Sequence, residues 1–256
     1  MGSVSAVLIT FNEEKKIENC LRALAWADEV IVVDGESRDR TVEIASQYTK
    51  KIYRRSFDQF SNQKNYGIDL ATGDWIFSVD ADEIVSSSLR DSLLRIAGEG
   101  SDCDGFWVHR TNYLFGKKLL FGGQGNEKIL RFFRRDRGRF EQPIHEKVVV
   151  KGKVSEVSGE LLHYSSSSVE DYLKKLSLYT HFEAHWMKEK GVKPTFFDLV
   201  VKPCLRFLYN YVFRLGFLDG YPGFLYHTLS VCYDFLKYAR LLELHSKKPE
   251  TPVVQP

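Results

Sequence analysis

The first hundred residues alternate between short apolar runs and amphipathic segments, and this alternation limits the fold more than any other feature. Four strand-like runs cover 4–11, 29–35, 50–55 and 73–83. Segments with helical spacing separate them, as in the series Ile17, Leu21 and Leu24. Short apolar runs rich in β-branched residues are typical of buried parallel strands. Strands that alternate with helices predict an α/β fold, an open and mostly parallel sheet with flanking helices and right-handed crossovers.

Polar side chains follow where these strands end, namely Thr10, Asn12, Asp34, Asp80 and Asp82. Because ligands of open α/β sheets bind beyond the carboxyl ends of the strands, we expect a binding site there. Asp80, Asp82 and Glu83 crowd three carboxylates into four residues, and such groups repel each other unless they hold something positive. Carboxylate oxygens suit Mg²⁺ or Mn²⁺, which often share their ligand shell with substrate phosphates. The alternative is a solvated turn in which Asp80 or Asp82 caps a helix over 86–97.

Charge and cysteine usage narrow the class of protein. The net charge of the 256 residues is +2, too close to neutral to predict a nucleic-acid partner. The cysteines at 20, 103, 204 and 232 form no CxxC pair, so we expect free thiols in a reducing compartment. The first residues lack a basic segment followed by an apolar one, so no secretory signal is expected. Together these features predict a cytoplasmic protein.

Four ordered motifs resemble those of the family 2 glycosyltransferases of GT-A fold. They are VLITFNEE, ADEVIVVDGESRDRT, QKNYGIDLATGDWIFSVDADE and IHEKVVVKG. The resemblance covers residues 4–165 and continues more loosely to about residue 243. It implies a GT-A (Rossmann-like) domain over 1–165, a C-terminal α-helical extension over 166–245 and a disordered tail over 246–256. The chain is most similar to the branch that includes bacterial lipopolysaccharide core-biosynthesis glucosyltransferases.

The resemblance also implies a reaction and roles for individual residues. A metal-dependent, inverting enzyme would move a hexose from a nucleotide-sugar, with UDP favoured, to a hydroxyl of a lipid-linked or lipopolysaccharide-core acceptor. The implied roles are a metal ligand at Asp82, a ribose or metal-water contact at Asp80, a nucleobase contact at Asp34, a pocket lining at Thr10 and Phe11, and a ribose contact at Glu13. Lys64 lies where the family often has a basic residue near the nucleotide. A solvated helix lysine is the alternative for Lys64.

Inverting transfer needs a general base that takes the proton of the acceptor hydroxyl. Glu146 and Glu127 each lie just before a predicted strand, and both are candidates. Glu146 is favoured because the adjacent His145 could bind the metal or the diphosphate. Neighbouring side chains of a strand point to opposite faces, so both can face the site only from a loop or bulge. An ordinary loop histidine, bonded to the backbone, is the alternative for His145.

The segment 130–140 carries five arginines: Arg131, Arg134, Arg135, Arg137 and Arg139. Guanidinium groups suit phosphates, so some of the five could bind donor or acceptor phosphates. A solvated hairpin with its turn at RDRGR is the alternative. Asp136 and Glu141 dilute the charge, and no recognition-helix pattern follows, which argues against nucleic acid.

After a predicted helix capped by Ser168, with Glu170 and Asp171 in its first turn, the chain becomes rich in Phe, Tyr and Leu. No stretch reaches about 18 uncharged apolar residues, so a membrane-spanning helix is not expected. Apolar helical faces with scattered basic residues suit the membrane interface, and we expect peripheral contact with the inner face of the cell membrane. Intramolecular packing or a homo-oligomer contact is the alternative.

Two other classes of function remain open. The first is a non-catalytic nucleotide-sugar-binding or scaffolding protein, which only an assay separates from a transferase. The second is a nucleotidyltransferase, which also uses carboxylates and a metal on an α/β sheet. That class usually has a glycine-rich, basic loop after its first strand, and ITFNEEKK lacks one.

Overall fold

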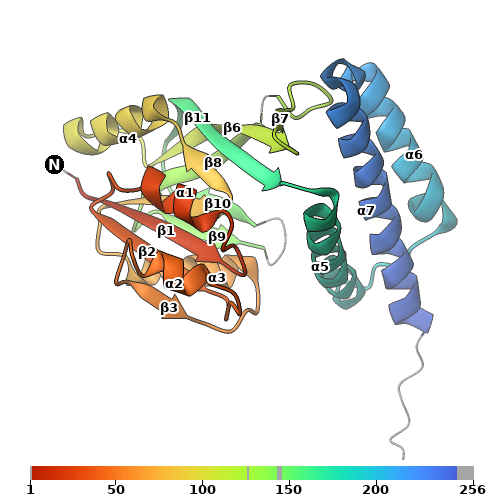
Figure 1. The fold of residues 1–256 in the computed structure, drawn as a ribbon, viewed down its shortest axis with the longest axis horizontal. Coiled ribbons are helices and arrows are strands. Elements are labelled where there is room, and N and C mark those ends of the chain that lie inside the picture. The colour runs from red at the N-terminus through yellow and green to blue at the C-terminus, as the bar shows by residue number, and fades with distance from the viewer. Residues whose placement is uncertain (1, 126, 143–145, 247–256) are drawn as a thin grey trace, which may run out of the picture. The chain divides into compact units, whose positions relative to one another are not determined.

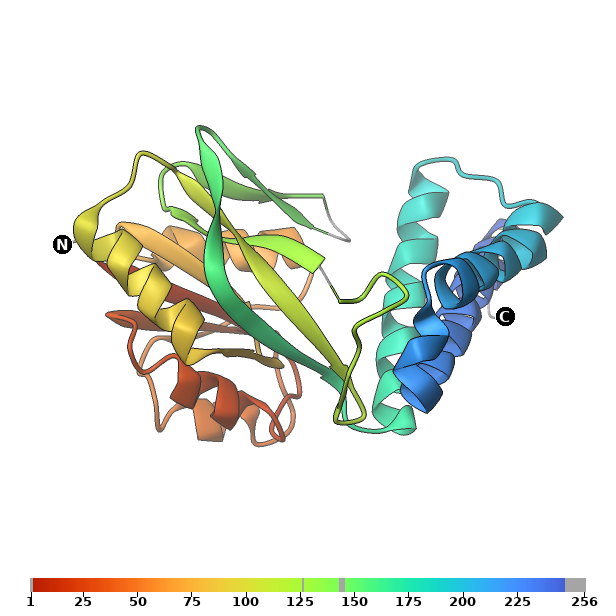
Figure 2. The same ribbon diagram turned by 90° about the horizontal axis from the view of Figure 1, so that it is seen from above.

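A mixed sheet forms the centre of the larger part of the chain. The computed structural model describes residues 2–125, 127–142 and 146–246. Within these residues nine strands join in the order β3-β2-β1-β4-β8-β6-β11-β5, with β7 paired to β6. Figures 1 and 2 show this sheet with helices on its faces. The predicted α/β class, with helices that flank the sheet and further helices in the C-terminal part, is confirmed.

The parallel half of the sheet contains the strands expected from the apolar runs. They are β1 (Val4–Thr10), β2 (Glu29–Asp34), β3 (Ile52–Arg54) and β4 (Trp75–Asp80). The register pairs Thr10 with Asp34 across β1 and β2, and Ile9 with Asp80 across β1 and β4. The polar residues at the ends of three strands therefore meet at one edge, as predicted.

The other half of the sheet is antiparallel and extends the site edge with later parts of the chain. Its strands are β5 (Glu83–Val85), β6 (Gly105–Leu114), β7 (Lys117–Lys118), β8 (Glu127–Arg134) and β11 (Val154–Ser166). β8 joins the two halves by pairing with β4, Phe77 opposite Phe132. A separate hairpin consists of β9 (Gly138–Glu141) and β10 (Lys147–Val150).

Both faces of the parallel half are buried, which explains its nearly continuous apolar runs. Val4, Ala6 and Leu8 of β1 point into a core closed by α1 (Ile17–Ala23), α2 (Thr41–Ala45) and α4 (Ser87–Glu99). Val7, which alternates with them, points into a second core with Ile68 of α3 (Phe60–Leu70) and residues of the β9–β10 hairpin. The sheet therefore lies between two packed layers.

Asp80, Asp82 and Ser37 could each cap a helix, and none of them does so. α4 is capped by Ser86, whose hydroxyl accepts the Leu89 N–H at 3.2 Å, and not by Asp80 or Asp82. The short strand β5 separates those carboxylates from the helix and leaves them at the sheet edge. The helical pattern over 37–49 makes Ser37 a possible cap, but α2 begins only at Thr41, and the Ser37 hydroxyl instead accepts the Asn12 N–H at 2.9 Å.

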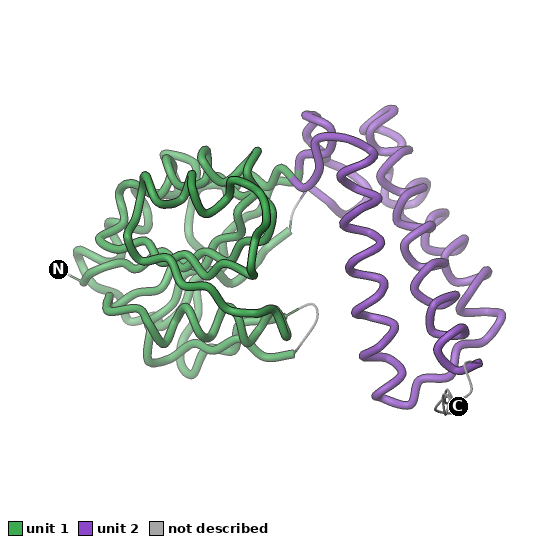
Figure 3. Tube along the Cα trace, turned by 60° about the horizontal axis from the view of Figure 1, so that its bottom comes forward, with its two compact units in different colours: residues 1–112, 126–164 green, residues 113–125, 165–256 purple. Residues whose placement is uncertain are grey.

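The chain divides into two compact units, coloured in Figure 3: residues 1–112 with 126–164, and residues 113–125 with 165–256. The helices of the second unit are α5 (Val169–Glu189), α6 (Lys202–Phe207) and α7 (Gly220–Ser246), with π-helical turns at Phe197–Val201 and Leu208–Phe213 and a 3₁₀ turn at Gly216–Asp219. The Ser168 cap of α5 is confirmed, because its hydroxyl accepts the Asp171 N–H at 3.1 Å. Asp219 ties the 113–125 segment to this unit by accepting the N–H groups of Leu120 and Phe121 at 2.9 Å.

The second unit has a small core and a large apolar surface. Ala184, Met187, Tyr238 and Leu241 pack between α5 and α7. Phe196, Phe213 and Tyr221 are 74%, 76% and 72% exposed. Among the helices in the described part of the chain, none has the length and apolar character needed to cross a membrane.

Candidate active site

The ends of β1 and β2 hold two buried polar atoms that the described protein does not satisfy. The Oδ2 atom of Asp34 accepts the Ser37 N–H at 3.0 Å. The Asp34 Oδ1 atom and the Thr10 Oγ1 atom are buried, and neither has a hydrogen-bond partner among the described residues. Buried polar atoms without partners are rare and costly in native proteins. Because Thr10 and Asp34 are paired in register, the two atoms suit the hydrogen-bonding edge of one polar ligand.

Phe11 and Glu13 continue from the end of β1. The Phe11 ring is 47% exposed beside this polar pair, so it presents a flat apolar face to solvent. The backbone of Glu13 is fixed by its N–H group, which donates to the Thr41 hydroxyl at 2.8 Å. The structure thus brings Thr10, Phe11, Glu13 and Asp34 to one edge, as the sequence predicts.

The acidic loop after β4 is ordered by its own carboxylates and by two buried cations. Glu83 is fully buried and accepts the Asp80 N–H at 3.0 Å, which closes the loop. The Asp80 carboxylate contacts Lys64 Nζ at 2.9 Å and Arg131 at 2.5 Å. Burial disfavours the charged form of Asp80, but the charges of Arg131 and Lys64 outweigh this effect and hold its pKa well below its usual value. Asp80 is therefore ionised throughout the physiological range.

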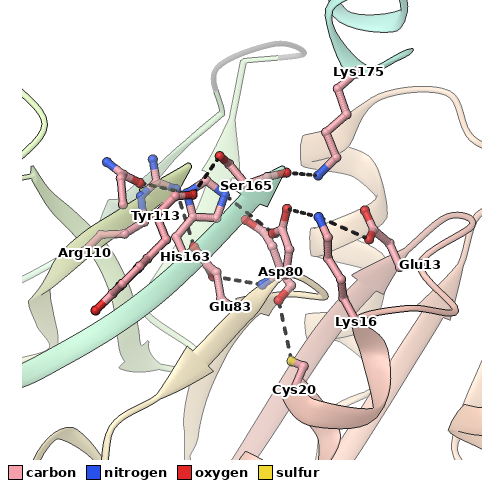
Figure 4. Close-up of polar contacts among 12 residues, drawn as sticks. Glu13, Lys16, Cys20, Asp80, Glu83, Arg110, Tyr113, His163, Ser165 and Lys175 are labelled. Atoms are coloured by element: carbon pink, nitrogen blue, oxygen red, sulfur yellow. Dashed lines mark hydrogen bonds and ion pairs between the residues drawn. The ribbon is translucent and has the colours of Figure 1, made fainter. Parts of the chain in front are cut away.

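Asp82 faces a histidine that the sequence did not suggest. Figure 4 shows His163 of β11 beside the acidic loop, and its Nε2 atom lies 3.6 Å from Asp82 Oδ1. The His163 Nδ1 atom is 2.8 Å from the Asn112 Oδ1 atom. The Asn112 amide nitrogen donates to Glu127 at 2.9 Å, so its oxygen faces His163 and accepts the Nδ1 proton. In the neutral imidazole this tautomer places the Nε2 lone pair toward a carboxylate.

A lone pair and a carboxylate 3.6 Å apart suit a cation between them, and an imidazole fixed through its other nitrogen is typical of metal sites. Asp82 is only 9% exposed, which excludes the solvated-turn alternative. No group of three or more His, Cys, Asp or Glu side chains forms a metal cluster in the described ranges. Mg²⁺ commonly takes one or two protein ligands and completes its shell with waters and substrate phosphates. Asp82 and His163 fit that pattern, whereas the predicted ligand His145 lies outside the described residues.

Lys64 joins the donor edge to the predicted base. Its ammonium group contacts Glu146 Oε1 at 2.7 Å in addition to Asp80. Lys64 is 1% exposed and its ammonium lies 5.1 Å from the Phe140 ring centroid, so the alternative of a solvated lysine is wrong. Glu146 immediately precedes β10 and is described as loop. The predicted residues Lys64, Asp80 and Glu146 are thus in direct contact.

Glu127, the second candidate base, is occupied by other partners. Arg110 donates to both of its oxygens, at 2.8 and 3.0 Å, and the Asn112 amide adds a third hydrogen bond at 2.9 Å. Burial opposes its charge, but Arg110 and Asn112 outweigh this effect and lower the pKa of Glu127. A carboxylate held in this way is a poor proton acceptor. Its arrangement indicates that Glu127 positions Arg110 and Asn112.

The arginine-rich segment separates into one site residue and a surface turn. Arg131 is buried and bonded to Asp80, within 3.5 Å of Glu83. Arg135, Arg137 and Arg139 are exposed around the turn between β8 and β9, and Arg134 stacks over the Trp75 ring. Four of the five arginines therefore lie at or near a surface turn, as the alternative holds, but this turn links strands of two different sheets and is not the turn of a hairpin. Arg110, Asn112 and His163 were missed, because each is an isolated residue on a long strand with no local motif.

Comparisons with known proteins agree with this geometry. The family model described as "Glycosyl transferase family 2" matches residues 5–149. The lipopolysaccharide core biosynthesis glycosyltransferase LpsC of Rhizobium meliloti is 28% identical, over 96% of this chain and 94% of its own length. An uncharacterized glycosyltransferase of Rickettsia typhi is also 28% identical, over 96% of this chain and 89% of its own.

Among solved structures, the mannosyltransferase PcManGT from Pyrobaculum calidifontis, in complex with GDP-Man and Mn²⁺, has the same fold. The match has a TM-score of 0.53 at 13% identity and covers 94% of this chain and 87% of that one. The family model matches more than half of the sequence and covers the parallel half of the sheet from residue 5 onward. The chain therefore belongs to glycosyl transferase family 2, and it is an enzyme that transfers a sugar from a nucleotide-sugar.

Proposed function

We propose that this enzyme transfers a hexose from a UDP-sugar, with inversion and with Mg²⁺ or Mn²⁺, to a hydroxyl of a lipid-linked or lipopolysaccharide-core acceptor. The observation that carries the proposal is the convergence of donor, metal and base candidates at one sheet edge. Lys64 bridges Asp80, on the donor side, and Glu146, the proposed base. The relative named for lipopolysaccharide core biosynthesis supports the acceptor class.

In this proposal the nucleotide binds along the ends of β1 and β2. Asp34 Oδ1 and Thr10 Oγ1 hydrogen-bond the nucleobase, Phe11 covers its face, and Glu13 and Asp80 contact the ribose. Asp82 and His163 would hold the metal, which would neutralise the negative charge that develops on the departing diphosphate. His145 is kept as an additional ligand or diphosphate contact.

Glu146 then acts as the general base. It takes the proton from the acceptor hydroxyl as the oxygen attacks the anomeric carbon from the face opposite the diphosphate. Lys64 holds the Glu146 carboxylate by its contact at 2.7 Å and so fixes its orientation. Because Lys64 also holds Asp80, movement of the donor-side loop would also move the base.

Ligand-dependent thermal stability tests the donor half of this proposal. UDP, UDP-glucose and GDP-mannose would each be added with and without Mn²⁺. A ligand that binds the native state raises the free energy of unfolding by RT ln(1 + [L]/Kd). We expect a UDP compound with Mn²⁺ to give the largest increase in Tm. If no nucleotide changes Tm, the proposed donor site is wrong; if binding occurs without transfer to any lipid acceptor, the non-catalytic alternative is favoured.

We further propose that the first unit is the transferase domain and that the helical unit binds the membrane that carries the acceptor. The stretch 190–224 has many exposed apolar side chains and carries five basic and two acidic residues. Apolar area together with positive charge suits an anionic lipid surface. Among the basic residues that the sequence suggests for lipid phosphates are Arg206 and Arg214. Arg206 is paired with buried Asp234 at 2.8 Å, so exposed Arg214 and Lys193 are the better candidates for this contact.

A further inference from the structure

Lys16 lies beside Asp82, at the start of α1. Its ammonium nitrogen is 3.8 Å from Asp82 Oδ2 and 3.9 Å from Glu13 Oε2, and the side chain is 17% exposed. Figure 4 shows Lys16 between Glu13 and the acidic loop that follows β4. Asp82 therefore has an ammonium near one oxygen and the His163 imidazole near the other.

The backbone fixes where the Lys16 side chain begins. The Lys16 N–H donates to the Glu13 carbonyl at 3.0 Å, and the Glu13 N–H donates to the Thr41 hydroxyl at 2.8 Å. The next residue, Ile17, is fully buried in the core. The lysine side chain has a flexible four-carbon stem. The ammonium group can therefore change position while the Lys16 backbone stays fixed.

The metal ion and the diphosphate of a bound donor carry opposite charges, so one repels the Lys16 ammonium and the other attracts it. A divalent cation at Asp82 would meet a like charge, and at about 4 Å in a partly buried site such repulsion is substantial. A diphosphate at the same place would attract both the ammonium and the cation. Lys16 therefore opposes metal binding in the absence of a nucleotide and favours it when the diphosphate is present.

We propose that Lys16 couples metal and donor binding. In the donor-free protein its ammonium lies by the Oδ2 atom of Asp82, next to the cation position at Oδ1, and in the loaded enzyme it contacts the donor diphosphate. This inference rests on the proposed function of the site and adds a residue that the predicted ligand set did not contain. Coupling between two ligands is reciprocal, so Lys16 raises the affinity for each in the presence of the other.

Binding measurements on Lys16→Met test the proposal without an activity assay. The Kd of Mn²⁺ would be measured with and without UDP, by calorimetry or from the Mn²⁺ paramagnetic signal. We expect the wild-type protein to bind Mn²⁺ more tightly with UDP by a factor within the usual range of about 5–150. In Lys16→Met, Mn²⁺ alone should bind several-fold more tightly and UDP more weakly, so that this factor falls toward one. Lys16→Arg, which keeps the charge, should retain most of this coupling factor.

Lys15→Met is the matched control, because it removes the same charge from the neighbouring exposed residue. It should leave the coupling factor unchanged. If Lys16→Met has the wild-type factor, or if Lys15→Met reduces it equally, the role of Lys16 is refuted while the donor site stands. If the wild-type protein binds neither Mn²⁺ nor UDP, the proposed function fails together with this inference.

Discussion

At the scale of single residues, the metal proposal depends on Asp82. Asp82→Asn keeps the shape of the side chain but removes the charge that lies between Lys16 and His163. We expect the variant to fold normally and to lose metal-dependent transfer by about 100-fold or more, since even the residues behind metal ligands are worth 10–100-fold. Turnover would be measured with saturating Mn²⁺ and with EDTA.

The control for this variant is Asp91→Asn, an exposed carboxylate on α4. It should show wild-type turnover and metal dependence. Unchanged activity of Asp82→Asn, or full wild-type activity in EDTA, would remove Asp82 from the mechanism. His163→Gln should also reduce metal-dependent transfer, but by less than Asp82→Asn does, because it leaves the carboxylate in place.

Glu146 and Glu127 give a second test, because one variant should mainly lose catalytic rate and the other mainly lose stability. Glu146→Gln should keep donor binding and lose about 10²–10⁴ in kcat, the usual contribution of a general base. Glu127→Gln should lose less rate but more stability, because it weakens one of the two carboxylate partners of the largely buried Arg110. Steady-state kinetics and Tm would be measured on both variants. The reverse result, a larger rate loss in Glu127→Gln, would make Glu127 the base.

Single residues also show where prediction from sequence ends. Asp34, Asp80 and Asp82 were found because each ends an apolar run, and strand ends must meet at one edge of a parallel sheet. Arg110 and His163 carry no such signal. They reach the site through antiparallel pairing of distant strands, which local periodicity does not specify.

At the scale of secondary-structure elements, Glu29 joins parts of the parallel sheet that are far apart in sequence. Its carboxylate accepts the Ser5 hydroxyl of β1, the Lys51 ammonium before β3 and the Thr72 N–H before β4. Burial would raise its pKa, but these donors outweigh burial and lower it from 4.5 to about 2. A carboxyl with a lowered folded-state pKa stabilises the fold above its unfolded pKa, and that stability is lost as pH falls toward the folded pKa.

Glu29→Gln should therefore lower the free energy of unfolding by about 2–3 kcal/mol at pH 7, the order that linkage gives for such a shift. The difference from wild type should shrink between about pH 5 and pH 2, since the wild-type carboxyl is protonated over that interval. Urea unfolding at several pH values measures it. A difference that stays constant with pH would show that the contacts of Glu29 do not depend on its charge.

At this scale the sequence was informative for the parallel half and less so for the antiparallel half. The motifs of β1, β2 and β4 combine apolar runs with polar ends, and all were located within a few residues. β5 was missed because it has three residues and follows directly on the acidic loop. The grouping of 113–125 with the C-terminal helices was also missed, because it depends on Asp219, about a hundred residues away in sequence.

At the scale of the whole molecule, the helical unit combines a small apolar core with many exposed apolar side chains. Large exposed patches on soluble proteins usually mark interaction sites. We expect the full-length protein to bind liposomes that contain anionic lipid and to dissociate as salt increases, because each basic residue near such a surface contributes about 1 kcal/mol. Flotation with anionic and with neutral liposomes measures this binding.

Two double variants separate the apolar and electrostatic contributions to that binding. Phe196→Ser with Phe213→Ser removes two of the most exposed rings and should weaken binding at every salt concentration. Lys193→Glu with Arg214→Glu should weaken it mainly at low salt, because screening already reduces the charge contribution at high salt. Arg206 is left intact, since reversing its charge would break the pair with Asp234 and disturb the fold. Leu94→Ser, on exposed α4 of the first unit, is the control. If the wild-type protein stays unbound with anionic liposomes at low salt and sediments as a dimer that Phe196→Ser with Phe213→Ser dissociates, the apolar surface joins two copies of the chain, and the acceptor need not be a lipid.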